Sequence, residues 1–328
     1  MRVSPRAAGL LAGVALDALV GDPRRGHPVA AFGRVASALE KKVYADSRAR
    51  GVAYTAVLVG GTLAGGIAVE RAVRGRPLVR AGVTALATWA VLGGTSLGRE
   101  GRVMSGFLED QDLEAARGRL GHLCARDPAG LGADELARAT VESVAENTSD
   151  ASIAPLVWGA VGGVPGLLAY RAANTLDAMV GYRSPRYERF GWASARLDDV
   201  VNWVPARLTG VVAVACAPRG RRSEAWRVLR RDGASHPSPN AGRCEAAFAG
   251  ALDVRLGGAN AYGGQVETRP ELGDGRSPEV ADIRRAVRLS ARVTAAAAVL
   301  CAALACAREG KGSRPLALAC AREEKRCG

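Results

Sequence analysis

Long runs of uncharged residues alternate with arginine-rich polar stretches along this 328-residue chain. Two of the runs, 52–69 and 81–98, hold eighteen residues each without a charge, which is near the length that an α-helix needs to cross a bilayer. Four arginines occupy the link between them: Arg71, Arg74, Arg76 and Arg80. The pattern predicts a hairpin of two membrane-spanning helices with a basic turn. A buried helix pair in a soluble protein is the alternative.

Four further apolar segments have the composition of full or partial spans, and they cover 7–20, 151–170, 200–217 and 292–307. Segment 151–170 is crowded with helix-breaking residues: Pro155, Gly159, Gly162, Gly163, Pro165 and Gly166. Irregular backbone at membrane depth is tolerated only inside protein or beside a cavity. The segment is therefore predicted to be broken or re-entrant. Glycine pairs at 61 and 65 and at 94 and 98 predict close helix approach.

These segments together predict an all-α polytopic membrane protein with about four to six embedded helices. Long polar helical loops are expected between them, including a basic helix at 219–232 and a glycine-rich loop at 256–264. We expect residues 1–307 to form one membrane-embedded unit. Residues 308–328 are expected to be a disordered basic tail.

Charge and cysteine content narrow the class of partner. The formal net charge is +13, and lysine occurs only at positions 41, 42, 311 and 325, so the basic residues are mostly arginine. A basic balance suits nucleic acid, an anionic membrane surface or anionic ligands. Nucleic acid is disfavoured, because aromatics make up 5% of the chain and no nucleic-acid motif appears. The seven cysteines lack zinc-like or redox-like spacing, which favours reduced, cytoplasm-facing chemistry.

An acidic stripe precedes the broken segment. Glu142, Glu146 and Asp150 repeat every four residues, so on a helix they share one face about 6 Å apart. Three like charges in a row are unfavourable unless solvent, a cation or basic side chains offset them. The stripe is thus either a solvated helix face or a polar site at a membrane surface.

Other charged and amide side chains lie at the edges of apolar segments, where such groups are functional candidates. They are Asp22, His27, Arg171, Asn174, Asp177, Asp198, Asp199 and Asn202. Arg207 lies within an apolar stretch and is expected to pair with one of these carboxylates. If 151–170 is re-entrant, the acidic stripe and the 174–199 region lie on the same side of the membrane.

Six blocks in order carry a family resemblance. They are GDPRRGHPV, ESVAENTSDASIAPL, YRAANTLDAMVGY, LDDVVNWVPARL, DGASHPSPNAGRCEAAFAGAL and LGGANAYGG. From about Leu16 to Gly264 the chain resembles the adenosylcobinamide-phosphate synthase family of cobalamin biosynthesis. The resemblance implies an ATP-dependent amide ligase in the cell membrane, with its active site facing the cytoplasm. The implied substrates are a corrinoid, adenosylcobyric acid, and aminopropanol phosphate, free aminopropanol or threonine phosphate. Docking of other pathway enzymes on the basic loops stays open.

The resemblance also implies roles for residues in these blocks. Mg²⁺ would be held by carboxylates chosen from Glu142, Glu146, Asp150, Asp198 and Asp199. Catalytic candidates are Glu142, Glu146, Asn147 and Asp150, with His27 or His236 deprotonating the amine. Substrate-binding candidates are Asp22, Arg171, Asn174, Asp177, Asn202, Arg207, Asn240, Arg243, Glu245 and Tyr262. No known nucleotide fingerprint is present, so ATP use rests on the resemblance alone.

Two other classes compete with this interpretation. A Mg-dependent membrane phosphotransferase or prenyltransferase would also use acidic clusters, but Asp198 and Asp199 lack a second aspartate-rich partner motif. A transporter or a non-enzymatic corrinoid-binding membrane protein would also use broken helices. The spans show no inverted repeat, which disfavours a transporter.

Overall fold

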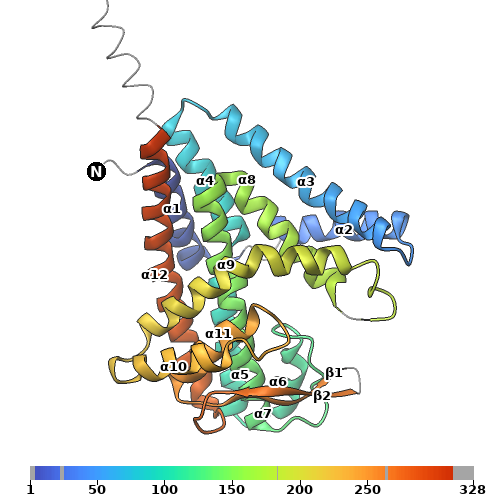
Figure 1. The fold of residues 1–328 in the computed structure, drawn as a ribbon, viewed down its shortest axis with the longest axis vertical. Coiled ribbons are helices and arrows are strands. Elements are labelled where there is room, and N and C mark those ends of the chain that lie inside the picture. Colours follow the sequence, from blue (N-terminus) through green and yellow to red (C-terminus); the bar gives the residue numbers. More distant parts are fainter. Residues whose placement is uncertain (1–3, 23–25, 183, 263–264, 313–328) are drawn as a thin grey trace, which may run out of the picture.

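A computed structural model of the chain describes residues 4–22, 26–182, 184–262 and 265–312, with only the backbone described at 260–262, 265–267 and 311–312. Helices account for almost all of the regular secondary structure in the described part (Figure 1). The elements in order are α1 (Pro5–Val20), α2 (Pro28–Val43), α3 (Arg48–Ala72), α4 (Pro77–Val91), α5 (Gly94–Glu109), α6 (Leu113–Leu120), α7 (Ala133–Thr148), the π-helix η1 (Ser149–Ile153), α8 (Ala154–Leu176), the π-helix η2 (Asp177–Gly181), α9 (Trp192–Cys216), the 3₁₀-helix η3 (Arg219–Arg221), α10 (Arg222–Asp232), α11 (Ala241–Leu252), β1 (Leu256–Tyr262), β2 (Gln265–Leu272) and α12 (Val280–Gly312).

Five helical segments are long and apolar enough to cross a membrane: Arg48–Ala72, Pro77–Glu109, Ala133–Gly181, Trp192–Cys216 and Val280–Gly310. The protein is therefore an all-α polytopic membrane protein, as the apolar runs predict. Helix α1, with 16 residues, is not among the five. Its N-terminus is fixed by Ser4, whose hydroxyl accepts a hydrogen bond from the Ala7 amide.

Helices α1, α4 and α12 lie side by side at one edge of the molecule (Figure 1). Small residues allow the approach of α1 to α4, because a Cβ at Gly9 or Gly13 would fall within 2.5 Å of the Cβ atoms of Thr84 or Thr88. Asp17 ties α1 to the start of α5, since its Oδ2 accepts hydrogen bonds from the Thr95 amide and hydroxyl at 3.1 and 3.0 Å. The charge that interrupts the first apolar run is thus used inside the bundle.

The predicted hairpin of 52–69 with 81–98 is wrong in its packing. Helix α3 packs on α8 and α9, whereas α4 packs on α1 and α8. No atom beyond the local helix lies within 4 Å of a Cβ built at Gly61 or Gly65, so that glycine pair mediates no approach. It is Gly66 that touches α8, with Pro165 Cα only 2.6 Å from its built Cβ. Apolar length predicts a helix but not its neighbour.

The segment from α7 to η2 reverses direction at Gly163. That residue has φ 66° and ψ −148°, a conformation that glycine alone adopts easily. Gly166 then lies against the carbonyl of Trp158, and Leu167 against Gly159, so the two limbs of α8 pack on each other. The prediction of a broken segment at 151–170 is confirmed. The reversal returns residues 170–181 to the level of η1.

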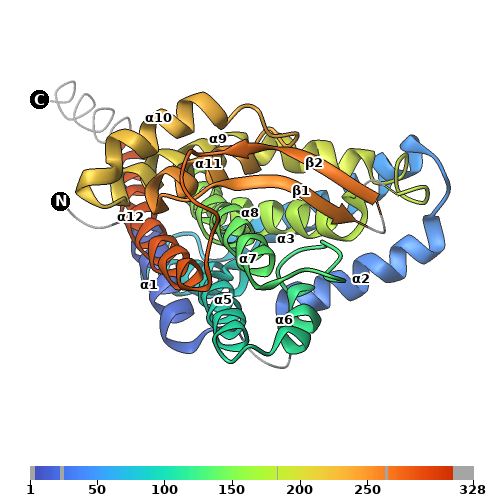
Figure 2. The same ribbon diagram turned by 90° about the horizontal axis from the view of Figure 1, so that it is seen from below.

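The polar end of the molecule contains α5, α6, α7, α10, α11 and a two-stranded antiparallel hairpin (Figure 1). The basic helix expected at 219–232 is present as η3 and α10. The glycine-rich loop expected at 256–264 is wrong, because Leu256–Tyr262 is strand β1, paired with β2 across α7 and α11 (Figure 2). Helix α12 runs to Gly312, so residues 308–312 of the expected tail are helical, and residues 313–328 lie outside the described part.

Candidate functional site

A polar cavity of about 130 Å³ lies where the reversing segment, α9 and the start of α11 meet. Side chains from four parts of the chain line it: Glu146, Ser149, Asp150, Asp177, Ala195, Asp198, Asp199, Asn202, Ala206, Ser238, Asn240, Ala241 and Cys244. Five of these are carboxylates, and no lysine, arginine or histidine is among the described residues that line the cavity. The arrangement therefore attracts cations strongly.

The reversal of α8 is what gathers these carboxylates. Glu146 and Asp150 come from α7 and η1, before the turn, and Asp177 comes from η2, after it. The Tyr170 hydroxyl joins the two limbs, because it lies 3.2 Å from the backbone carbonyl of Asp150. A continuous helix would separate residues 150 and 170 by about 30 Å. The arrangement expected for a re-entrant segment, with both acidic regions together, is the one observed.

Asp198 is fixed by two amide side chains. Asn202 Nδ2 donates to its Oδ2 at 2.9 Å, and Asn174 Nδ2 donates to its Oδ1 at 3.3 Å. Asn202 is itself oriented by the Tyr170 hydroxyl, 2.9 Å from its Oδ1. Each carboxylate oxygen of Asp198 keeps lone pairs for a further ligand. Asn174 and Asn202, expected to touch substrate, thus act here by positioning an aspartate.

Asp150 lies on the π-helix η1 and lines the cavity. The wider turn of this helix, in which backbone bonds run from residue i to i+5, shifts the register of the side chains that follow. Glu146, Asp150 and Asp177 accept no hydrogen bond through their side chains from any described residue. Their oxygens are free for a ligand.

Glu142 does not line the cavity. Its carboxylate pairs with the buried guanidinium of Arg126 and accepts a hydrogen bond from the Gly257 amide at 2.7 Å. It therefore anchors strand β1 and the loop before α7. The acidic stripe is split between a structural ion pair at Glu142 and a cavity at Glu146 and Asp150.

A second buried polar pair, His236 in the loop before α11 and Glu245 on α11, lies beside the cavity. His236 Nε2 lies 3.9 Å from Glu245 Oε1 and 3.3 Å from an Nη of Arg269. Burial first, and then the neighbouring charges of Glu142 and Glu146, raise the pKa of Glu245 well above its usual range. Neither His236 nor Glu245 lines the cavity. Both connect α11 to the strand hairpin.

Three other candidates, Asn240, Arg171 and Asn147, differ in how they lie relative to the cavity. Asn240 lines it and donates from Nδ2 to the backbone carbonyl of Asp199 at 2.9 Å. Arg171 contacts Asn174 Oδ1 at 3.4 Å and borders a separate apolar cavity beside the start of α2. Asn147 points away, since its amide donates to the Ser143 carbonyl at 2.9 Å.

The remaining candidates lie elsewhere. Arg207 was expected to pair with a carboxylate, and this is wrong: its guanidinium stacks on the Trp203 ring at 3.9 Å and donates to the Trp203 carbonyl, which keeps its charge at the edge of α9. Asp22 and His27 pair with each other at 3.6 Å, and His27 caps α2. Arg243 is on α11 outside the cavity lining. The Tyr262 side chain lies outside the described part.

No three histidine, cysteine, aspartate or glutamate side chains in the described ranges converge closely enough to form a ready-made metal site. The donor set still suits Mg²⁺, which prefers oxygen ligands and is usually held by one or two carboxylates plus substrate phosphate. Glu146, Asp150, Asp177 and Asp198 offer such oxygens around one cavity. A phosphate-bearing substrate would supply the rest.

Sequence reasoning missed several residues around the site. Tyr170 orients Asn202 and joins the two limbs, Arg126 neutralises Glu142, and Ser149, Ser238 and Cys244 line the cavity. Tyr170 could have been found from the sequence, because it begins the YRAANTLDAMVGY block and lies at the end of an apolar run. Nothing in the sequence indicated the role of Arg126, because its partner Glu142 is 16 residues away across a turn.

The sequence of the chain is similar to those of known proteins. The profile of the CobD/Cbib protein family matches residues 10–290. A cobalamin biosynthesis protein CobD of Mycobacterium tuberculosis is 59% identical over 297 residues, covering 90% of this chain and 94% of the relative. Proteins of the same name from Geobacter metallireducens and Rhodobacter capsulatus are 46% and 40% identical, over 83% and 88% of this chain and 87% and 94% of theirs. No solved structure matches the chain.

Proposed function

Because the chain belongs to the CobD/Cbib family of cobalamin biosynthesis, we propose that it is an ATP-dependent ligase acting on adenosylcobyric acid. The reaction joins the amine of aminopropanol phosphate, aminopropanol or threonine phosphate to a propionate carboxyl. With the first of these amines the product is adenosylcobinamide phosphate. The observation that carries the proposal is the cavity at which Glu146, Asp150, Asp177 and Asp198 meet.

Amide formation from a carboxylate and an amine in water is uphill, so the carboxylate must be activated. We propose an acyl phosphate: a propionate oxygen attacks the γ-phosphorus of ATP and ADP leaves. The amine nitrogen then attacks the acyl carbon, inorganic phosphate leaves with the electron pair of the C–O bond, and a proton departs from nitrogen. Both steps bring phosphate to a negatively charged cavity, which requires a cation.

Mg²⁺ is the cation that the donor set suits, with Glu146 and Asp150 as the proposed ligands and Asp198 as a third oxygen source. When bound, Mg²⁺ would neutralise charge on the phosphates and hold them for transfer. Asn174 and Asn202 keep Asp198 oriented for this task. This assignment is supported by geometry, because the carboxylate oxygens of Glu146, Asp150 and Asp198 line the same cavity.

The amine enters as an ammonium and must lose a proton before it attacks. Neither His27 nor His236 lines the cavity, so a carboxylate accepts this proton in our proposal. Asp177 suits the role, because it comes from the second limb, faces the other carboxylates and accepts no hydrogen bond from a described side chain. A base must lie within reach of the proton that it removes.

Cavity size limits how the corrinoid binds. A volume of about 130 Å³ is below that of an ordinary drug-sized ligand pocket. It admits a propionate arm and a phosphoryl group, while the corrin ring stays outside. ATP is a cytoplasmic substrate, so we propose that the cavity opens toward the cytoplasm from the cell membrane.

A reconstituted assay tests the proposal. Purified full-length protein in lipid nanodiscs is incubated with adenosylcobyric acid, aminopropanol phosphate, ATP and Mg²⁺, and the amide is detected by mass. We expect product and ADP in equal amounts, and neither when Mg²⁺ is chelated. Folded protein that binds the corrinoid but forms no amide with any of the three amines would refute the ligase and favour a binding role.

A further inference from the structure

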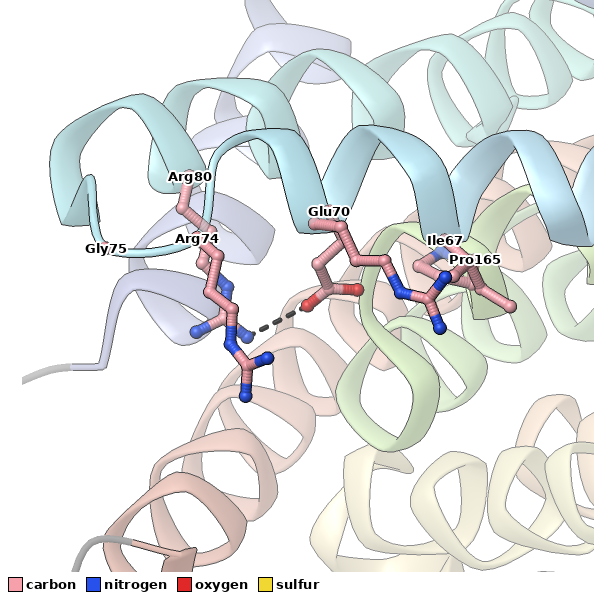
Figure 3. A pocket seen from close by; sticks show the side chains of 7 residues that line it. Ile67, Glu70, Arg74, Gly75, Arg80 and Pro165 are labelled. Atoms are coloured by element: carbon pink, nitrogen blue, oxygen red, sulfur yellow. Dashed lines mark hydrogen bonds and ion pairs between the residues drawn. The ribbon is translucent and has the colours of Figure 1, made fainter.

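A second pocket lies away from the acidic cavity, at the junction of α3, α4 and the turn of α8. Its volume is about 370 Å³. Figure 3 shows Glu70 and Arg80 joined across it, with Arg74 and Gly75 on the connecting turn and Ile67 and Pro165 on its apolar side. Arg71 completes the lining. The proposed reaction does not use this pocket.

Charge in the pocket is unbalanced. Glu70 Oε1 accepts from Arg6 at 3.1 Å and from Arg80 at 2.9 Å, and Arg80 also pairs with Glu309 at 2.6 Å. These two arginines therefore neutralise the two carboxylates. Arg71 and Arg74 are exposed at the pocket, and their side chains make no ion pair or hydrogen bond with any described residue. Two positive charges remain available to an anion.

The surface beside the pocket is apolar. Helix α3 is a candidate membrane span with only 22% of its most apolar window buried inside the protein. Val57, Leu63 and Val69 are exposed along it by 63%, 40% and 42%. An exposed apolar surface of this extent on a spanning helix is suited to lipid chains. The arginines thus lie at the end of a surface that acyl chains can cover.

We propose that this pocket binds the phosphate of an anionic membrane phospholipid. Guanidinium groups bind phosphate through paired N–H donors and stay charged at every physiological pH, which fits Arg71 and Arg74. Ile67 and Pro165 receive the glycerol end, and the chains follow α3. Free phosphate would use the same arginines but gain nothing from the apolar side, so we assign the lipid as the source.

Lipid in this pocket would also contact the turn that builds the acidic cavity. Pro165 lines the pocket, and a Cβ at Gly163 would lie 2.6 Å from Glu70 Oε2. The Glu70 network therefore packs directly on the backbone at the reversal of α8. Binding of a phospholipid adds contacts to the folded state alone, which stabilises it.

The test measures lipid binding rather than catalysis, so its outcome is independent of the proposed reaction. Full-length protein in detergent is titrated with phosphatidylglycerol, phosphatidylcholine or inorganic phosphate, followed by thermal stability and native mass spectrometry. We expect phosphatidylglycerol to raise the melting temperature and to be retained, with little effect of the other two. Arg71→Gln with Arg74→Gln should weaken phosphatidylglycerol binding about 25-fold, about fivefold for each arginine.

The matched control is Arg219→Gln with Arg230→Gln, which removes the same charge from two exposed arginines at the polar end. That variant should keep wild-type affinity for phosphatidylglycerol. The proposal is overturned if the Arg71 and Arg74 variant keeps the full preference for phosphatidylglycerol, or if phosphatidylcholine binds equally well. An equal response to inorganic phosphate would replace the lipid by a free anion. If the double variant is not monodisperse, Arg74→Gln alone must show the fivefold loss.

Discussion

The Tyr170 hydroxyl lies 3.2 Å from the backbone carbonyl of Asp150, although twenty residues separate them in the chain. This contact joins η1, which precedes α8, to the second limb of α8. It also places Asp150 beside Asn202, which shares the same hydroxyl at 2.9 Å. The acidic cavity depends on this reversal, because its carboxylates come from both limbs and from α9.

Substitution of Gly163 should disturb the reversal. Gly163→Ala places a side chain at φ 66° and ψ −148° and brings its Cβ within 2.6 Å of the Glu70 carboxylate. We expect a loss of about 1–3 kcal/mol in the free energy of unfolding, seen as a lower melting temperature in detergent. Gly162→Ala is the control, because no atom lies within 4 Å of its built Cβ. Equal effects of the two substitutions would argue against a strained turn.

Removal of the Tyr170 hydroxyl should weaken the orientation of the side chains around the cavity while the cavity itself persists. Tyr170→Phe leaves Asn202 Oδ1 without its donor and removes the link to Asp150, which should cost about 1–3 kcal/mol of stability. Asp198 is then less well oriented, so amide formation should slow. Tyr182→Phe, at an exposed tyrosine whose ring packs on Tyr187, is the control. If Tyr170→Phe had the wild-type rate and melting temperature, the hydrogen bonds of the Tyr170 hydroxyl would contribute neither to activity nor to stability.

Substitutions of Glu142 and Glu146, both in the acidic stripe, should affect stability differently. Glu142→Gln removes the charge that faces buried Arg126, which should cost about 3–5 kcal/mol and lower expression and melting temperature. Glu146→Gln alters an oxygen that faces the cavity and accepts no hydrogen bond from the described side chains, so the fold should persist. Melting curves of the two purified variants separate the cases. A stable Glu142→Gln protein would contradict the structural role.

Stability should depend on pH through Glu245. Burial raises its pKa well above the usual value of 4.5, with the charges of Glu142 and Glu146 adding to the effect. A raised pKa means that the folded state binds the proton more tightly than the unfolded state. The resulting stabilisation is complete below pH 4.5 and is lost as the pH rises through the folded-state pKa.

Glu245→Gln removes this dependence, so its melting temperature should exceed that of wild type increasingly toward alkaline pH. Melting curves across the pH range for both proteins give the comparison. The difference between the two proteins isolates Glu245 from the other buried acids, which both proteins share. Parallel curves would show that Glu245 ionises normally in the fold.

The sequence predicted helices better than their neighbours. Uncharged length is enough to identify α3 and α4, because a bilayer demands it. Their packing was not predictable from the same signal. Gly61 and Gly65 look like a contact face but meet nothing, whereas Gly9 and Gly13 hold α1 against α4. Which glycine faces a neighbour depends on the route of the whole chain.

Carboxylates from two segments were proposed as metal ligands from the sequence, and that role stays a prediction. Glu146, Asp150, Asp198 and Asp199 were grouped from the sequence and line one cavity. The sequence also grouped Glu142 with these residues, because a regular four-residue spacing on a helix implies one face. The partner Arg126 breaks that inference, because it holds Glu142 in a buried ion pair outside the cavity lining. A contact between residues that only folding brings together, such as Arg126 with Glu142, produces no periodic pattern in the sequence.

We propose that the cavity carboxylates hold the metal and the phosphate in an amide ligase reaction. The most direct measurement is the rate of adenosylcobinamide phosphate formation by Glu146→Gln and Asp150→Asn, with Glu188→Gln as an exposed control. We predict a loss of about 100-fold or more in each cavity variant, at wild-type melting temperature, with the control unchanged. Wild-type rates in both folded cavity variants would contradict the claim.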